Sequence, residues 1–379
     1  MSLHRLVETQ RRQAQRALEN ANLWKEDKMG HKAKAIAIDH RETQRRAALR
    51  EDLEDAILAR LRRTAPRDAS LAGLTLAGAA KLCDIAQRIP HGTRLSGGSG
   101  DLPVIFTNSA EKHALDFYRA QRPAARRFTR EIEVRSLRPA TVAHLDTPAL
   151  AEVGEGGRIE HGVPAEGGEV MRMARYASIV ELTFESIAND DLGAFRAIPE
   201  GAAEAVSRLD SDVVFEVLLA NSGAGPTLSD GVNFFHADHG NLMQAAALSA
   251  PALAAAAAAM RAQLSPSGAR MNLAPRFLLV GPELEFVAHE LVASHTAGGA
   301  AAVLEVLVDA RIEDASWYLF SDPHVGRPAF VRGALFGRPG PQLVSEHNFD
   351  TGGIAFKVTA TAGCGPADYR AAVRTPSAT

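Results

Sequence analysis

The segment EVGEGGRIEHGVPAEGGEVMRMARYASIVELT, residues 152–183, predicts a long β-hairpin. Its six glycines punctuate two strand-like runs, and the second run extends from Glu169 to Thr183. A two-stranded ribbon is only marginally stable alone in water, because it has little surface to bury. The second run therefore needs a surface, which either the same chain or a neighbouring subunit supplies. The side chains that need it are Val170, Met171, Met173 and Tyr176.

Residues 184–221, which follow the hairpin, predict a short helix, a turn at 189–191 and then a long helix. Pro199 suits the first turn of the long helix, where a missing N–H costs little. Apolar residues recur along that helix at steps of three and four, so one face packs on a sheet. They are Val206, Leu209, Val213 and Val217.

Upstream of the hairpin, the glycine- and serine-rich residues 91–103 predict a linker, and residues 104–120 predict a helix. Asn108 or Ser109 suits the N-cap of that helix. Residues 128–150 predict an irregular, extended segment.

Downstream of the long helix, residues 249–264 predict a helix capped by Ser249 or Ala250. Residues 276–294 predict a strand, a turn and a helix that starts at Pro282. Strand-like runs joined by short loops fill most of the remaining chain. The class is therefore α+β rather than a doubly wound parallel sheet.

Composition excludes several classes of protein. The chain has 379 residues, enough for two or three packed units. No apolar run approaches the roughly 20 residues that span a bilayer, and the N-terminus is too polar for a secretory signal. Two cysteines are too few for a disulfide framework or a tetrahedral zinc site. A net charge of −3 argues against a dedicated nucleic-acid binder.

Residues 1–65 differ from this average, with 15 lysines and arginines against 10 acidic residues, a charge of about +5. Their pattern is helical and mostly polar, with one narrow apolar stripe. The stripe comprises Leu49, Leu53, Ile57 and Leu61. So thin a stripe predicts either a long helix resting on a partner or another copy, or a solvated helical extension. Pro66 marks its end, because proline disfavours helix at the preceding residue.

The segment VNFFHADHG, residues 232–240, is the one candidate for catalysis or metal binding. His236, Asp238 and His239 could hold a metal ion in a hydrolase. A catalytic zinc needs a third protein ligand and the HExxH spacing is absent, so the sequence favours a structural loop. In that loop Asp238 or His239 bonds backbone groups while both phenylalanines are buried. No nucleophile elbow is present either, so we expect no enzyme, no catalytic residue, no metal and no cofactor.

Four phrases in order carry a resemblance to a known family. They are IANDDLGAF (187–195), NFFHADHGNL (233–242), RFLLVGPELE (276–285) and WYLFSDP (317–323), with DLPVIFTNSA (101–110) before them. The series resembles the major capsid proteins of tailed phages, specifically the Mu-type major head subunit, over roughly residues 66–375. Such proteins take the Hong Kong 97 capsid fold.

The resemblance implies a division of the chain into parts. The hairpin at 152–183 would be the extended E-loop, and 199–220 the spine helix. The full set is a helical, scaffold-like extension (1–65), an N-terminal arm region (66–151), the E-loop (152–183), the peripheral domain (184–227 and 346–379) and the axial domain (228–345).

The resemblance also implies a function: self-assembly into an icosahedral shell that encloses DNA. The implied partners are other copies, DNA in non-specific contact, and portal and scaffold or protease proteins, with no membrane. The implied location is the virion, after assembly in the host cytoplasm. A metal-dependent hydrolase and an encapsulin-like compartment protein are the alternatives.

Some relatives lock their shells with lysine–asparagine isopeptide bonds. This chain has no lysine between residues 113 and 356, so its E-loop has no donor and we expect no covalent cross-links. Arginine-rich contacts suit a shell instead, because a guanidinium makes several directed bonds. The candidates for contact between subunits are Arg158, Glu160, Glu169, Arg172, Arg175 and Tyr176.

Overall fold

The computed structural model describes residues 101–146, 165–182, 192–297, 304–347 and 354–378, together with seven helical residues between 48 and 59. Most of the extension, including the stripe from Leu49 to Leu61, and residues 66–100 and 147–151 of the arm region lie outside the described residues. The chain divides into two compact units. Residues 1–114, 179–199 and 343–357 make up the first, and 115–178, 200–342 and 358–379 the second. No helix within the described ranges has the length and apolarity that crossing a membrane requires.

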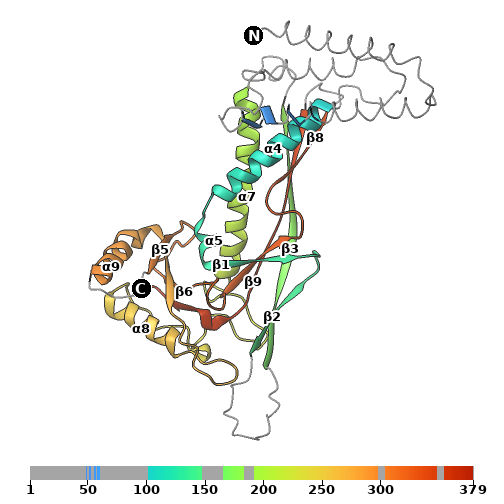
Figure 1. The fold of residues 1–379 in the computed structure, drawn as a ribbon. Coiled ribbons are helices and arrows are strands. Elements are labelled where there is room, and N and C mark those ends of the chain that lie inside the picture. The colour runs from blue at the N-terminus through green and yellow to red at the C-terminus, as the bar shows by residue number, and fades with distance from the viewer. Residues whose placement is uncertain are drawn as a thin grey trace, which may run out of the picture. The chain divides into compact units, whose positions relative to one another are not determined.

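The larger sheet has six strands and contains the predicted hairpin strand (Figure 1). The strand order is β1-β7-β9-β3-β2, and β8 also pairs with β9. β1 runs parallel to β7, whereas β7 is antiparallel to β9. The strands are β1 (Thr129–Val134), β2 (Ala140–Asp146), β3 (Ala165–Leu182), β7 (Phe330–Leu335), β8 (Gln342–His347) and β9 (Ile354–Pro366).

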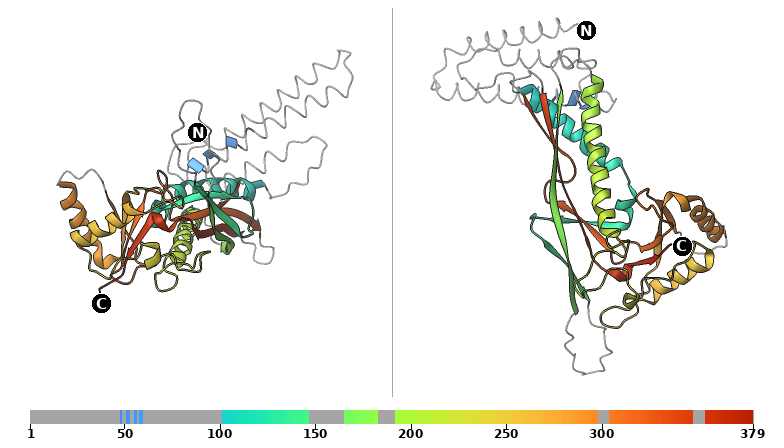
Figure 2. Two further views of the ribbon diagram at one scale, coloured as in Figure 1. Left: turned by 90° about the horizontal axis from the view of Figure 1, so that it is seen from below. Right: turned by 180° about the vertical axis from the view of Figure 1, so that it is seen from behind.

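The hairpin differs from the prediction in its first strand. β3 pairs antiparallel with β2, from Ala140 opposite Met171 to Asp146 opposite Ala165. The first strand therefore precedes residue 152, and the predicted irregular segment at 128–150 holds β1 and β2 instead. ATVAHLD is short and lacks a regular alternation of apolar and polar residues, so it does not stand out from its surroundings. Figure 2 shows β2 beside only the beginning of β3.

The chain itself supplies a surface for the first half of β3. Met171 and Met173 are 0% and 7% exposed. They pack where β7 and β9 carry glycine, and a Cβ at Gly333 would collide with the Sδ atom of Met173. At Gly365 a Cβ would lie 2.7 Å from the Cβ of Met171. Of the two supports that the sequence left open, the same chain therefore supplies the one for these two methionines.

The second half of β3 has no such cover. Every residue from Ala174 to Glu181 is exposed, although alternate residues of a strand point to opposite faces. Tyr176 and Ile179 are 38% and 65% exposed. For this half, support from another copy stays a prediction.

The second sheet lies beside two helices, and its strand β6 carries the fully buried side chains of Trp317, Tyr318 and Phe320. Its order is β10-β6-β4-β5, with β10 (Ala372–Thr375), β6 (Trp317–Ser321), β4 (Pro275–Val280) and β5 (Glu305–Val308). α8 (Ala250–Ala262) contacts β10, and α9 (Glu285–Ala297) contacts β5 (Figure 1). Ser249 caps α8 as predicted, since its side chain accepts a hydrogen bond from the Ala252 N–H. Phe128 stacks on Phe320 at 4.5 Å between ring centroids.

Two helix starts differ from the predictions. α4 spans Asp101–Ala120, so neither Asn108 nor Ser109 is its N-cap. Pro103 lies in the first turn, which accepts proline. α7 spans Leu192–Leu218 and contains Pro199 in its interior, where the sequence had suggested a start. α5 (Ala124–Phe128) is a short helix before β1.

Candidate functional site

The predicted structural loop follows α7 and turns sharply at Ala237–His239, a single turn of 3-10 helix. The His236 side chain caps this turn by accepting a hydrogen bond from the Asp238 N–H at 3.2 Å. Gly240 ends it at φ +64°, in the left-handed region that favours glycine. Phe234 and Phe235 are 0% and 1% exposed, as the structural interpretation requires.

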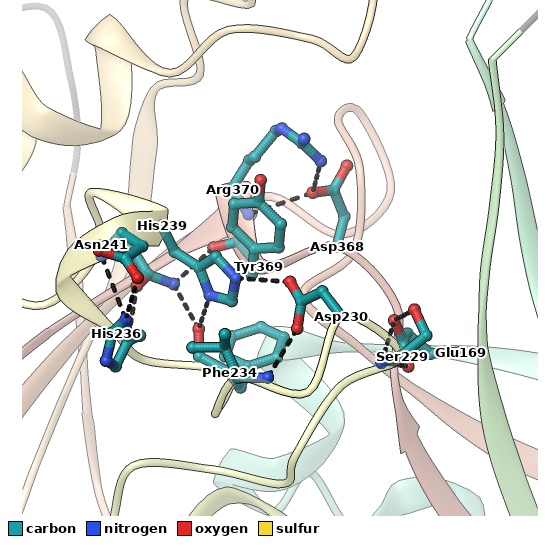
Figure 3. Close-up of polar contacts among 12 residues, drawn as sticks. Glu169, Ser229, Asp230, Phe234, His236, His239, Asn241, Asp368, Tyr369 and Arg370 are labelled. Atoms are coloured by element: carbon teal, nitrogen blue, oxygen red, sulfur yellow. Dashed lines mark hydrogen bonds and ion pairs between the residues drawn. The ribbon is translucent and has the colours of Figure 1, made fainter.

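His239 is the buried centre of the loop (Figure 3). Its Nδ1 lies 3.1 Å from the Phe234 carbonyl oxygen and its Nε2 lies 2.9 Å from a carboxylate oxygen of Asp230. The ring also stacks on Tyr369, with centroids 4.0 Å apart. Both ring nitrogens therefore face acceptors within the protein, and neither is left to bind an ion.

Asp230 is the charged partner of this histidine. Burial alone raises the pKa of Asp230, but hydrogen bonds from the Val232 N–H and from His239 outweigh it. The pKa therefore lies below its ordinary value of 3.8. The ionised carboxylate is the form that the fold stabilises.

Asn241 joins the loop to the C-terminal strand, and the sequence analysis did not single it out. Its side chain is fully buried and donates to the carbonyls of Phe234 and Tyr369, at 2.9 and 3.0 Å. Its Oδ1 accepts from the His236 N–H at 3.0 Å. The signal available in the sequence was the position of this polar residue directly after the turn-forming Gly240. A buried amide at such a place forms hydrogen bonds with backbone groups.

The other two residues of the candidate metal site, His236 and Asp238, contact each other. The His236 Nδ1 lies 3.3 Å from a carboxylate oxygen of Asp238, whose side chain is 77% exposed. The rings of His236 and His239 lie 6.3 Å apart and nearly perpendicular. No group of three or more His, Cys, Asp or Glu suited to a metal ion occurs in the described part of the chain. His239, which the hydrolase alternative would use as a ligand, is thus committed to Phe234 and Asp230.

A buried charged cluster joins α7 to the larger sheet. Asp210 accepts from Tyr118 at 2.6 Å and from Arg126 at 3.0 Å. Arg332 on β7 contacts Asp210 at 3.3 Å and Glu131 at 2.6 Å. Burial alone would lower the pKa of Arg332, but these two carboxylates raise it above its ordinary value. Breaking one partner of a buried pair leaves an uncompensated charge, so the cluster fixes the helix on the sheet.

The structure places four of the six candidate contact residues on β3. Glu169 bonds within its own chain, since its carboxylate accepts from the Ser229 N–H and from its hydroxyl at 2.7 Å (Figure 3). Arg172, Arg175 and Tyr176 are exposed. The other two candidates, Arg158 and Glu160, lie outside the described residues.

A family model described as phage capsid protein matches residues 168–375, more than half of the chain. A search of curated proteins finds no match. Solved structures of similar shape include the Cyanophage P-SCSP1u capsid, at 11% identity and a TM-score of 0.44 over 67% of this chain and 87% of that one. A phage-related protein of Bordetella bronchiseptica RB50 has 12% identity and a TM-score of 0.46 over 69% and 94%.

A virus-like particle from Pyrococcus furiosus has 11% identity and a TM-score of 0.41 over 71% and 99%. The family assignment rests on the family match, which spans β3 from Gly168, the helix α7, the second sheet and the strands β7, β8 and β9 of the larger sheet. Over this same range the α+β class expected from the sequence is confirmed. The chain belongs to the phage capsid protein family.

Proposed function

We propose that this chain is a major capsid protein whose copies assemble into a closed shell around DNA. The observation that carries the proposal is the family match over residues 168–375. The exposed second half of β3 supports it, because a strand with apolar residues uncovered on both faces suits contact with another copy.

The proposed location and partners follow from the family and from the positive charge of residues 1–65. The shell belongs in the virion, with portal and scaffold or protease proteins as partners, after assembly in the host cytoplasm. The basic residues 1–65 suit a scaffold-like segment that attracts phosphate groups. That the chain resembles Mu-type head subunits in particular is also part of the proposal. We also infer that the chain is structural and has no enzymatic activity, since His236, Asp238 and His239 serve the loop.

Six contact residues remain part of this proposal. Arg158, Glu160, Arg172, Arg175 and Tyr176 would pair with neighbouring copies in the shell. Glu169 would do so only by exchanging its bonds to Ser229.

The proposal is tested by the size of the purified protein. Light scattering and negative-stain microscopy of the full chain should show closed shells of uniform diameter. Shells that contain nucleic acid support the genome-enclosing role, whereas shells filled with one protein species favour the encapsulin-like alternative. A chain that stays monomeric at every concentration and salt condition would contradict the proposal.

A further inference from the structure

A pocket of about 140 Å³ lies on the larger sheet, where β7 ends and β8 begins. β3, β9, the β1–β2 loop and the β7–β8 loop all contribute to its lining. All of its lining residues belong to the second compact unit. One water molecule takes up about 30 Å³ of the liquid, so the pocket has room for a small ligand.

The pocket begins where a row of close contacts between β3 and β9 ends. Met171 lies against Gly365 and Met173 lies against Gly363, so the two strands run in opposite directions. Both methionines are buried, because glycine on the neighbouring strand leaves their side chains room. The sequence of β9 has no other glycine, and beyond these pairs the residues on this face change from apolar to polar.

Two arginines and two threonines line the pocket. Arg175 and Thr361 form the next pair on the face that carries the methionines, two residues further along each strand. Thr359 lies on the same face of β9. Arg338 comes from the loop after β7, and its guanidinium reaches only Gln342 among the described residues, at 3.5 Å. Guanidinium and hydroxyl groups all donate hydrogen bonds, so the pocket presents four donor side chains.

No carboxylate balances the two arginines inside the pocket, because none of the residues that line it is acidic. The adjoining segments, residues 135–139, 170–180, 335–342 and 358–361, contain no aspartate or glutamate either. Arg175 forms no hydrogen bond or ion pair within the described part of the chain. Two like charges that share a small space repel each other, and a guanidinium bonds best to a carboxylate or a phosphate group. An anion in the pocket therefore relieves this repulsion and also gains hydrogen bonds.

The arrangement of the donors suits a small phosphate better than a nucleic-acid backbone or a single carboxylate. Backbone phosphates follow one another along a strand and are matched by rows of cationic groups. Arg172 and Arg175 are three residues apart on β3, so they point to opposite faces and form no such row. A phosphate monoester carries a charge of about −1.5 to −2 and three acceptor oxygens, whereas a carboxylate carries one charge and two oxygens. Two converging guanidinium groups with two hydroxyls match the phosphate.

We propose that this pocket binds one phosphate dianion, either free phosphate or the terminal phosphate of a small phosphomonoester. Arg175 and Arg338 pair with its oxygens, and Thr359 and Thr361 donate their hydroxyl groups. The bound anion joins β3 and β9 to the β7–β8 loop and so stabilises the folded chain. The proposed shell contact also uses Arg175, whose five N–H donors allow two partners. The inference concerns the single chain and does not rest on the proposed shell.

Titration of the full chain with inorganic phosphate tests the site. Isothermal titration calorimetry should show one phosphate bound per chain, and R175A/R338A should bind it at least about tenfold more weakly, since one hydrogen bond to a charged group contributes a factor of that size. R270A, at an exposed arginine outside the pocket, should bind like the wild type. Phosphate also stabilises proteins without binding to a site. The thermal unfolding midpoint should therefore rise more for the wild type than for R175A/R338A at equal phosphate concentration.

A second variant covers the case in which R175A/R338A folds poorly. R175K/R338K keeps both charges but loses the paired N–H groups of the guanidinium, so it should fold and bind phosphate more weakly than the wild type. Displacement of bound phosphate by adenosine monophosphate assigns the site to phosphomonoesters, and a failure to displace it assigns the site to free phosphate. A wild-type chain that binds no phosphate overturns the proposal whatever the variants do.

The remaining outcomes separate this inference from the proposed function. Equal binding by the wild type and by both double variants means an adventitious ion only and overturns the site. A short DNA duplex without terminal phosphates that binds through the two arginines, while inorganic phosphate does not bind, assigns them to DNA and overturns it as well. Shells that bind no phosphate overturn this inference alone. A chain that binds phosphate but forms no shells contradicts the proposed function and leaves the site standing.

Discussion

Asn241 is the single residue on which the His239 loop depends most. One fully buried amide side chain satisfies two carbonyls and one N–H. Leaving such groups without partners costs the desolvation penalty of each. The loop that contains His236, Asp238 and His239 is thus held in place by Asn241, whose side chain does not ionise.

Replacing that amide should destabilise the fold. Asn241→Ala should lower the free energy of unfolding by about 2–3 kcal/mol, because three backbone groups lose the partner that a fully buried side chain gives them. Chemical denaturation of the unassembled protein measures the change. Asp238→Ala is the control, since a side chain that is 77% exposed should contribute less than about 0.5 kcal/mol. Equal effects of the two substitutions would contradict the assignment.

Asp230 gives the loop a dependence on pH. Because the pKa of Asp230 is lower in the fold than its ordinary 3.8, the ionised form stabilises the protein above that value. The contribution is lost as the pH falls through the folded-state pKa. Wild type should therefore be more stable than Asp230→Asn at pH 6, and the difference should shrink as the pH falls below 3.8. Denaturation midpoints of both proteins across this range measure it, and a difference that grows in acid would contradict the account.

The larger sheet depends on the close approach of β3 to its neighbouring strands. Gly365 lies against the backbone and side chain of Met171. A Cβ built on Gly365 would lie 2.7 Å from the Cβ of Met171 and 3.0 Å from its Cα. A methyl group there forces strand β3 away from β9, so Gly365→Ala should cost about 1–3 kcal/mol.

Gly201 provides a matched control in the same chain. It lies in α7 with nothing within 4 Å of its built Cβ. Gly201→Ala should stabilise the protein by about 0.5–1 kcal/mol, because alanine favours the helix. Thermal unfolding of both variants should show shifts of opposite sign. Equal shifts would contradict the packing described for β3.

How far the sequence predicts these elements depends on whether the signal is local. The second strand of the hairpin and the helices at α8 and α9 follow from periodicity and caps, which are local. β2 is missed because its partner lies beyond a glycine-rich segment, and pairing across that distance leaves no local mark. The start of α7 is missed because Pro199 suits a first turn, although tertiary packing carries the helix through it.

The sequence predicted that residues 232–240 form a structural loop, but it did not predict which residues hold that loop. The structural interpretation of residues 232–240 needed only the short spacing between Gly231 and Gly240 and the missing zinc pattern. The partners Asp230, Asn241 and Tyr369 could not be predicted, because tertiary contacts bring them to His239.

At the scale of the whole molecule, the placement of lysine limits how a shell is fastened. Between Lys112 and Lys357 the chain has no lysine, so the hairpin cannot donate an amine to an isopeptide bond. Shells boiled in denaturant and reductant should therefore run as a single band of about 40 kDa, the mass of one chain. A ladder of linked subunits that survives reduction would contradict this expectation.

The proposed assembly gives a reason why half of β3 is uncovered. One copy buries Met171 and Met173 against its own glycines but leaves the strand exposed from Ala174 onward. An exposed apolar strand invites association, and a closed shell directs that association to one site on each copy.

A cryo-electron microscopy reconstruction of assembled particles, at a resolution that traces side chains, tests this account most directly. It should show residues 174–181 of each copy covered by a neighbouring copy, with the side chains of Arg175 and Tyr176 in that contact. Particles in which this half of β3 faces solvent, or is covered by its own chain, would contradict the account.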